Sequence, residues 1–116
     1  IPIIAPLSHN GEGKMLNTNA DTIASTVATA LAQKQSTQLI IGFELDGVLR
    51  DFNDKSSVIE TITPELFDQY KSEGIISDGM IPKLSNAFDA IKAGVESVKI
   101  CNALKVGGDI GTVISK

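Results

Sequence analysis

Lys83 places a cationic side chain at the expected start of a helix. It follows the run Asp-Gly-Met-Ile-Pro at residues 78–82, and an apolar helical spacing continues over residues 84–93. Proline is tolerated in the first helical turn, where its missing N–H costs no hydrogen bond, so Lys83 falls beside unpaired N–H groups that attract anions. A cation there opposes the helix dipole. The segment predicts either a contact with a strongly negative group, such as a transferring phosphoryl group, or a solvated surface lysine.

Asn17, Asn19 and Asp21 crowd the start of another expected helix, whose body is apolar. Side-chain amides offer donors and acceptors together, which suits a carboxylate or amide ligand. The aspartate could pair with a lysine and hold it in place. Helix capping is the alternative, and it explains Asn19 and part of the case for Asp21 but not Asn17.

The apolar periodicity alternates between strand and helix spacing along a single expected domain of 116 residues. Strands are expected at residues 1–5, 38–43, 58–62, 97–101 and 112–115, and helices at residues 19–34, 63–73 and 82–93. This alternation predicts an α/β fold with a largely parallel sheet. Ligands collect at the carboxyl ends of strands in such folds, so the two polar helix starts are candidates for one site.

Composition argues against several classes of partner. A net charge of −4, a pI near 4.8 and a single arginine leave no basic surface for a nucleic acid. No apolar stretch approaches the roughly 20 residues that span a bilayer, so no membrane partner is expected. Cys101 has no internal partner, which favours a buried thiol in a reducing cytoplasm. The one histidine, His9, lies in a polar turn and is expected to be exposed, with no metal site around it.

The chain opens with Ile-Pro-Ile-Ile-Ala-Pro, which has the pattern of a strand already under way and no initiator methionine. We therefore expect these residues to be part of a longer protein.

Two motifs in order resemble the second half of the N-acetylglutamate kinases, in the amino acid kinase superfamily. They are Asn-x-Asn-Ala-Asp at residues 17–21 and Gly-Met-Ile-Pro-Lys at residues 79–83, and the resemblance extends over essentially the whole chain. It implies a carbamate kinase-like fold, an α/β three-layer sandwich with a largely parallel central sheet. This chain would be the carboxyl-terminal, ATP-binding portion. The amino-terminal substrate-binding half, with its glycine-rich loops and another lysine, would be absent, and the isolated fragment would be inactive.

The resemblance also implies roles for individual residues. The first asparagine of the motif contacts the acylated amino acid in that family, which corresponds to Asn17, with Asn19 beside it. Asp21 would organise catalytic lysines, and Lys83 would contact the phosphoryl group. The residues expected to flank the nucleotide come from the loop after residue 43 and from the segment before Lys83, and they are Phe43, Glu44, Asp46, Gly47, Ile76, Gly79 and Met80.

The implied reaction transfers the γ-phosphoryl of ATP, with Mg²⁺ carried by the nucleotide, to the side-chain carboxylate of N-acetylglutamate in arginine biosynthesis. The implied enzyme is a cytoplasmic homo-oligomer. The family usually has Asp-Val-x-Gly after the strand, whereas this chain has Glu44-Leu45-Asp46-Gly47, so the choice of nucleotide-binding carboxylate stays open. The run Phe-Glu-x-x-Gly-Val-Leu is similar to a branch that uses N-succinylglutamate. A carbamate, glutamate or uridylate kinase, and a non-catalytic nucleotide-binding or oligomerisation module, are the alternatives.

Overall fold

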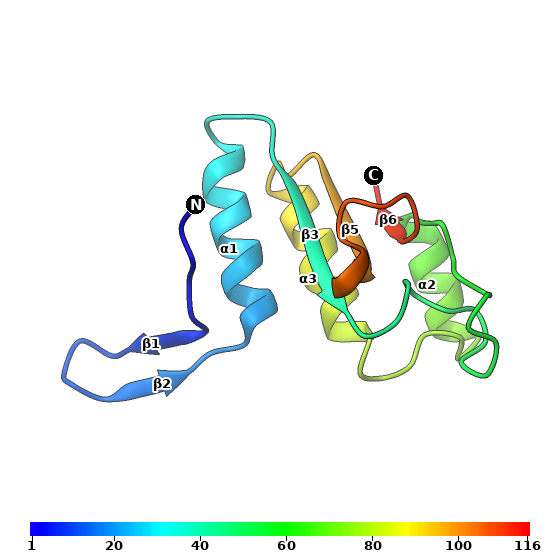
Figure 1. The fold of residues 1–116 in the computed structure, drawn as a ribbon, viewed down its shortest axis with the longest axis horizontal. Coiled ribbons are helices and arrows are strands. Elements are labelled where there is room, and N and C mark those ends of the chain that lie inside the picture. The colour runs from blue at the N-terminus through cyan, green and yellow to red at the C-terminus, as the bar shows by residue number, and fades with distance from the viewer.

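The computed structural model describes all of residues 1–116 and contains two β-sheets of different size (Figure 1). A hairpin comes first and a four-stranded sheet with three helices follows. In chain order the elements are β1 (Leu7–His9), β2 (Met15–Asn17), α1 (Ala20–Ala32), β3 (Gln38–Phe43), β4 (Thr61–Ile62), α2 (Pro64–Ser72), α3 (Ile81–Lys92), β5 (Ser97–Asn102), the 3₁₀ turn η1 (Ala103–Lys105) and β6 (Thr112–Ile114).

The larger sheet has the strand order β3-β5-β6-β4. Strand β3 pairs with β5 in parallel along its whole length, and β4 pairs with β6 in parallel, while β5 and β6 are antiparallel. A mostly parallel sheet in an α/β chain confirms the predicted α/β class with a largely parallel sheet. The parallel β3–β5 pair also brings residues 43 and 102 side by side at one end of the sheet.

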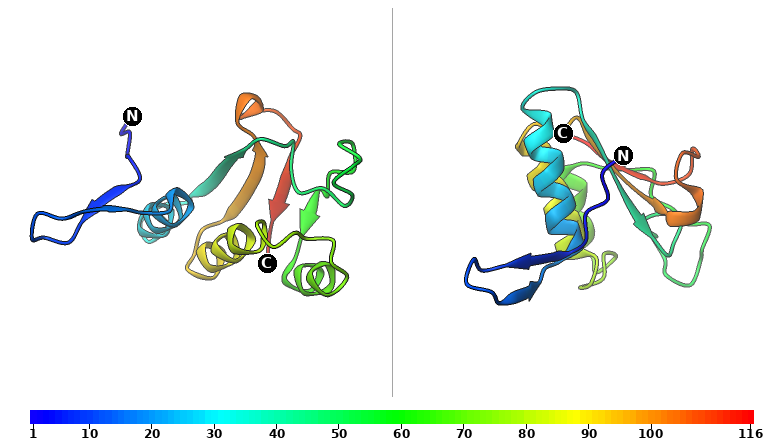
Figure 2. Two further views of the ribbon diagram at one scale, coloured as in Figure 1. Left: turned by 90° about the horizontal axis from the view of Figure 1, so that it is seen from below. Right: turned by 60° about the vertical axis from the view of Figure 1, so that its left-hand side comes forward.

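All three helices pack on one face of this sheet (Figure 2). Alternate residues of β3 point towards them, so Leu39 and Ile41 are buried whereas Ile40 stays 44% exposed on the opposite face. Helix α3 is the most deeply buried helix and places five side chains in the core. Burial at a helical spacing explains why this helix keeps a fixed position relative to the strand ends.

The helix starts are built from different chemistry. The Asn19 side chain caps α1 by accepting the Asp21 N–H at 2.8 Å, and the Thr63 hydroxyl caps α2 by accepting the Leu66 N–H at 3.4 Å. Helix α3 has no side-chain cap. The backbone N–H groups at its start therefore donate to no capping side chain.

Two expected strands differ in the structure. Residues 1–5 form no strand and are exposed, because no neighbouring segment supplies the hydrogen bonds that a strand needs, and the hairpin β1–β2 forms after them instead. The strand expected at residues 58–62 is reduced to Thr61–Ile62, which pairs with β6. Val58 forms a single bridge with Leu49 instead.

Strand β3 lies at the edge of the sheet.

Cys101 is fully buried and His9 is exposed, as expected. None of the helices combines the length and the apolar character needed to cross a bilayer.

Candidate functional site

Lys83 and Asp21 form an ion pair between two helix starts. The Lys83 ammonium lies 2.5 Å from Asp21 Oδ2, and the two side chains are only 16% and 24% exposed. Helices α1 and α3 lie side by side with their starting ends together (Figure 1), which joins residues 62 positions apart. The pairing expected from the sequence is present, and Lys83 is not the solvated surface lysine of the alternative reading.

Phe43 brings the end of β3 to the same place. The Lys83 ammonium lies 5.7 Å from the centroid of the Phe43 ring, within the range of a cation–π contact. Phe43 is the last residue of β3, so the pair stands at the carboxyl end of a parallel strand, where α/β folds bind ligands. The carboxylate and the ring together limit the positions that the ammonium can occupy.

The first turn of α3 leaves one backbone donor unused. The Met80 and Ile81 N–H groups both donate to the Ser77 carbonyl, and Pro82 has no N–H. The Lys83 N–H makes no hydrogen bond to backbone or side chain. Lys83 therefore presents a free N–H and an ammonium group at a positive helix end, an arrangement that suits an anion with several oxygens.

The Phe43 ring that the Lys83 ammonium approaches also lines a cavity of about 750 Å³, although neither Lys83 nor Asp21 lines it. Its walls come from the loop after β3 and from the segment before α3, and most of its lining residues are apolar. Four of the residues expected to contact a nucleotide lie in these walls, namely Phe43, Gly47, Ile76 and Met80. The volume and the apolar lining are typical of a site for a small organic ligand.

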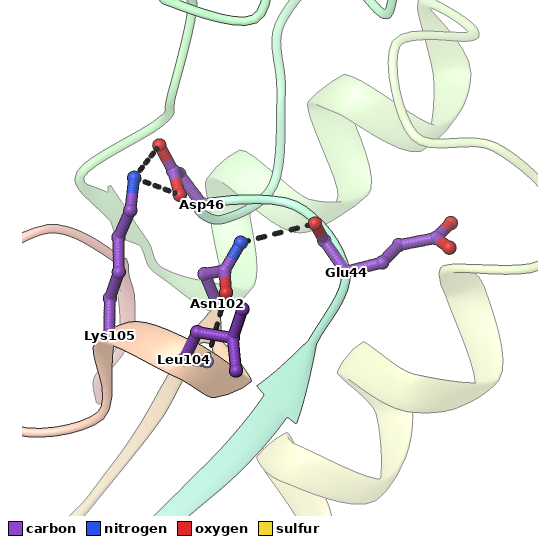
Figure 3. Close-up of polar contacts among 5 residues, drawn as sticks. All are labelled: Glu44, Asp46, Asn102, Leu104 and Lys105. Carbon is purple, nitrogen blue, oxygen red and sulfur yellow. Dashed lines mark hydrogen bonds and ion pairs between the residues drawn. The ribbon is translucent and has the colours of Figure 1, made fainter.

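The other three expected nucleotide contacts lie outside this cavity. Glu44 and Asp46 line an adjoining hollow of about 200 Å³, which shares Leu45 and Leu49 with the cavity, and Gly79 lines neither. Both carboxylate oxygens of Asp46 accept hydrogen bonds from the Lys105 ammonium, at 2.8 and 2.9 Å (Figure 3). The Glu44 carbonyl accepts a hydrogen bond from the Asn102 amide at 3.2 Å, while the Glu44 carboxylate points away from this group.

Gly47 is required by close packing between the cavity loop and β6. A Cβ atom at this position would lie 2.7 Å from Thr112 Oγ1 and 2.8 Å from Val58 Cγ1, closer than real Cβ contacts. The adjacent Val48 N–H donates to the buried Thr112 hydroxyl at 2.8 Å. By contrast, a Cβ at Gly79 would meet nothing within 4 Å, so sterics do not require glycine at that position.

The two asparagines of the first motif have different surroundings. Asn19 caps α1, as the capping alternative predicted. Asn17 is exposed at the end of β2, where its backbone pairs with Leu7. Asn17 precedes Asp21 by four positions in the sequence, and its contact with a substrate stays a prediction.

Arg50 and Tyr70 form a contact that sequence reasoning missed. The Arg50 guanidinium donates to the Tyr70 hydroxyl at 3.0 Å, and Arg50 Cζ lies 5.2 Å from the centroid of the Tyr70 ring. Arg50 also lines the large cavity, whereas Tyr70 is buried behind it. The two residues are 20 positions apart across a loop and a helix, and no sequence spacing signals such a pair.

Comparison with known proteins places this chain in a family. The profile of the amino acid kinase family matches residues 1–102. The chain belongs to the amino acid kinase family. Among relatives, it is 59% identical over 102 residues to an acetylglutamate kinase of Cytophaga hutchinsonii, covering 88% of this chain and 39% of that one. It is 54% identical over 116 residues to an acetylglutamate kinase of Phocaeicola vulgatus, covering 100% of this chain and 45% of that one.

Solved structures agree on the fold. The chain is similar to the smu.665 protein of Streptococcus mutans, with a TM-score of 0.77 and 38% identity, covering 98% of this chain and 42% of that one. A Giardia carbamate kinase matches with a TM-score of 0.67 over 95% of this chain and 39% of its own, and at 18% identity this likeness concerns the fold alone. The chain spans less than half the length of the relatives it matches.

Proposed function

We propose that this chain is the nucleotide-binding portion of an enzyme that transfers the γ-phosphoryl group of ATP to the side-chain carboxylate of N-acetylglutamate. The supporting observation is the Lys83–Asp21 pair, held at the uncapped start of α3 beside an apolar cavity of about 750 Å³. The cavity suits the base and ribose of a nucleotide, and the helix start suits its phosphates. The names of the similar acetylglutamate kinases support the choice of acceptor.

The chemistry asks for little covalent participation from the protein. Phosphoryl transfer needs two anions held in line and the charge of the transferring group neutralised. The ammonium and the free N–H of Lys83 would supply donors to that group, and Asp21 would act through Lys83 by holding its ammonium at the helix start. The apolar walls would pack against the base and ribose and so hold the nucleotide in place.

Mg²⁺ would reach this site bound to the nucleotide, because two nearby carboxylates are already paired with lysines. Asp21 is engaged by Lys83, and Asp46 by Lys105. No three side chains of His, Cys, Asp or Glu form a group that could hold a metal ion. Mg²⁺ commonly keeps its waters and binds through substrate phosphates with few protein ligands. Bound in this way, Mg²⁺ would neutralise part of the phosphate charge.

The acceptor, the assembly and the pathway are parts of the same proposal. N-succinylglutamate is the alternative acceptor, because residues 43–49 carry Phe-Glu-x-x-Gly-Val-Leu. Asn17 and Asn19 stand at the acceptor side of the site in this proposal, and residues beyond this chain complete it. We infer a cytoplasmic homo-oligomer acting in arginine biosynthesis.

A hybrid enzyme tests the proposal. The part of the Cytophaga hutchinsonii relative that precedes the match would be fused ahead of Ile1, and ADP release would be measured with ATP and a panel of acceptors. The proposal predicts turnover with N-acetylglutamate or N-succinylglutamate, and none with glutamate, carbamate or uridylate. A folded hybrid that binds ATP without any transfer would favour a non-catalytic nucleotide-binding module instead.

A further inference from the structure

The loop of residues 44–49 forms much of one wall of the large cavity, and the segment from β5 to β6 holds this loop from outside. Three side chains of that segment bond it at separate points: Asn102 at the Glu44 carbonyl, Lys105 at the Asp46 carboxylate, and Thr112 at the Val48 N–H (Figure 3 shows the first two). The loop therefore depends on residues more than 50 positions away in the sequence.

Asn102 is oriented by a second hydrogen bond. Its side-chain carbonyl accepts the Leu104 N–H at 3.0 Å, which starts η1, while its amide donates to Glu44. The η1 turn in turn presents Lys105, the last residue of that element, towards Asp46. The turn and the loop are thus joined as one unit.

We propose that Asp46 and Lys105 are a positioning pair, which keeps the cavity loop in its nucleotide-binding conformation, and that Asp46 does not itself touch the nucleotide. Both oxygens of the carboxylate are engaged by the ammonium, and neither residue lines the large cavity. The residues of this segment that do line it lie on either side of Asp46, and they are Phe43, Leu45, Gly47, Val48 and Leu49.

Nucleotide affinity then depends on the ion pair through the population of the closed loop. When the loop opens, the Val48 N–H loses the Thr112 hydroxyl and the cavity loses its wall. A ligand that binds only the closed loop has its apparent affinity reduced by the closed fraction. This inference rests on the proposed nucleotide-binding function, but the loop itself can be observed without a nucleotide.

A charge swap tests the pair. The variants are Asp46→Lys, Lys105→Asp and the double variant with both changes, with Lys34→Asp as a control because Lys34 is an exposed lysine in no ion pair. Hydrogen exchange of the Val48 amide measures loop opening in the 116-residue chain. The KM for ATP, with kcat, is measured in the hybrid enzyme.

Each single reversal replaces the attractive pair with two like charges in the same place, and we expect Val48 exchange and the KM for ATP to rise about threefold to tenfold with kcat little changed. The double variant should return both values to within about twofold of the parent, and the control should leave them unchanged. If Asp46 instead contacts the nucleotide or its metal, the double variant would restore Val48 exchange but not KM, which would overturn the proposal. Unchanged Val48 exchange in both single variants would also overturn it. If Val48 exchange responds to the variants as expected but the unsubstituted hybrid enzyme never binds ATP, only the proposed function would be refuted.

Discussion

The Lys83–Asp21 pair predicts a measurable coupling energy across the α1–α3 contact. We consider the variants Asp21→Asn, Lys83→Met and the double variant. Each single change leaves one charged group at a helix start without its partner, in a position that is only 16% or 24% exposed. The double cycle cancels the separate effect of each charge on its own helix dipole, which is favourable for Asp21 and unfavourable for Lys83.

The size of the coupling follows from the partial burial of the pair. Fully exposed ion pairs are worth roughly 0–1 kcal/mol, whereas removing one partner of a buried pair costs about 3–5 kcal/mol. A pair held at 2.5 Å with about a fifth of each side chain exposed lies between these limits, so we expect a coupling of about 1–3 kcal/mol.

Urea unfolding followed by circular dichroism gives the free energy of unfolding for each of the four proteins. The coupling should persist at about 1 M salt, because burial limits screening of the pair. A coupling below about 0.5 kcal/mol, or one abolished by salt, would refute the conclusion that this pair is held in a protected site.

Three further predictions follow from other parts of the chain. Gly47→Ala should lower the free energy of unfolding by about 1–3 kcal/mol, because the added Cβ would collide with β6. The matched change Gly79→Ala should have little effect, and equal losses of stability for the two variants in urea unfolding would contradict this packing argument. The hydrogen bond from Thr63 lowers the pKa of Glu65. The stabilising contribution of ionised Glu65 is therefore complete above its unfolded-state pKa and is lost as the pH falls through its lower folded-state pKa. Glu65→Gln should flatten the loss of stability between about pH 5 and 3, and an unaltered profile of stability against pH would argue against this bond. If the proposed homo-oligomer forms through the open face of β3, Ile40→Lys should reduce self-association in sedimentation, because Ile40 is exposed there on an edge strand; an unchanged distribution would rule that surface out.

The regular elements were predictable where local signals agreed. The strand at residues 38–43 was predicted with its observed bounds, because a buried run there is flanked by polar and turn residues. Helix α2 carries its own signals in Thr63, Pro64 and Gly74. The apolar start at residues 1–5 misled the prediction, because a strand exists only where a neighbour completes its hydrogen bonds.

Part of the site was predictable because local signals marked two helix starts. The approach of Asp21 to Lys83 was expected from two motifs, each at a helix start. The Arg50–Tyr70 and Asp46–Lys105 contacts were not, because they join loops to residues 20 and 59 positions away without a motif at either end. Tertiary packing alone decides where such loop residues meet.

The most direct measurement is the turnover of the hybrid enzyme carrying Lys83→Ala, with Lys92→Ala at the other end of α3 as the matched control. Loss of a donor to the transferring phosphoryl group should lower kcat by about 10²–10³-fold, while circular dichroism shows an unchanged fold and the control keeps its activity. Release of ADP at the parental rate by Lys83→Ala would contradict the assignment of Lys83 to phosphoryl transfer.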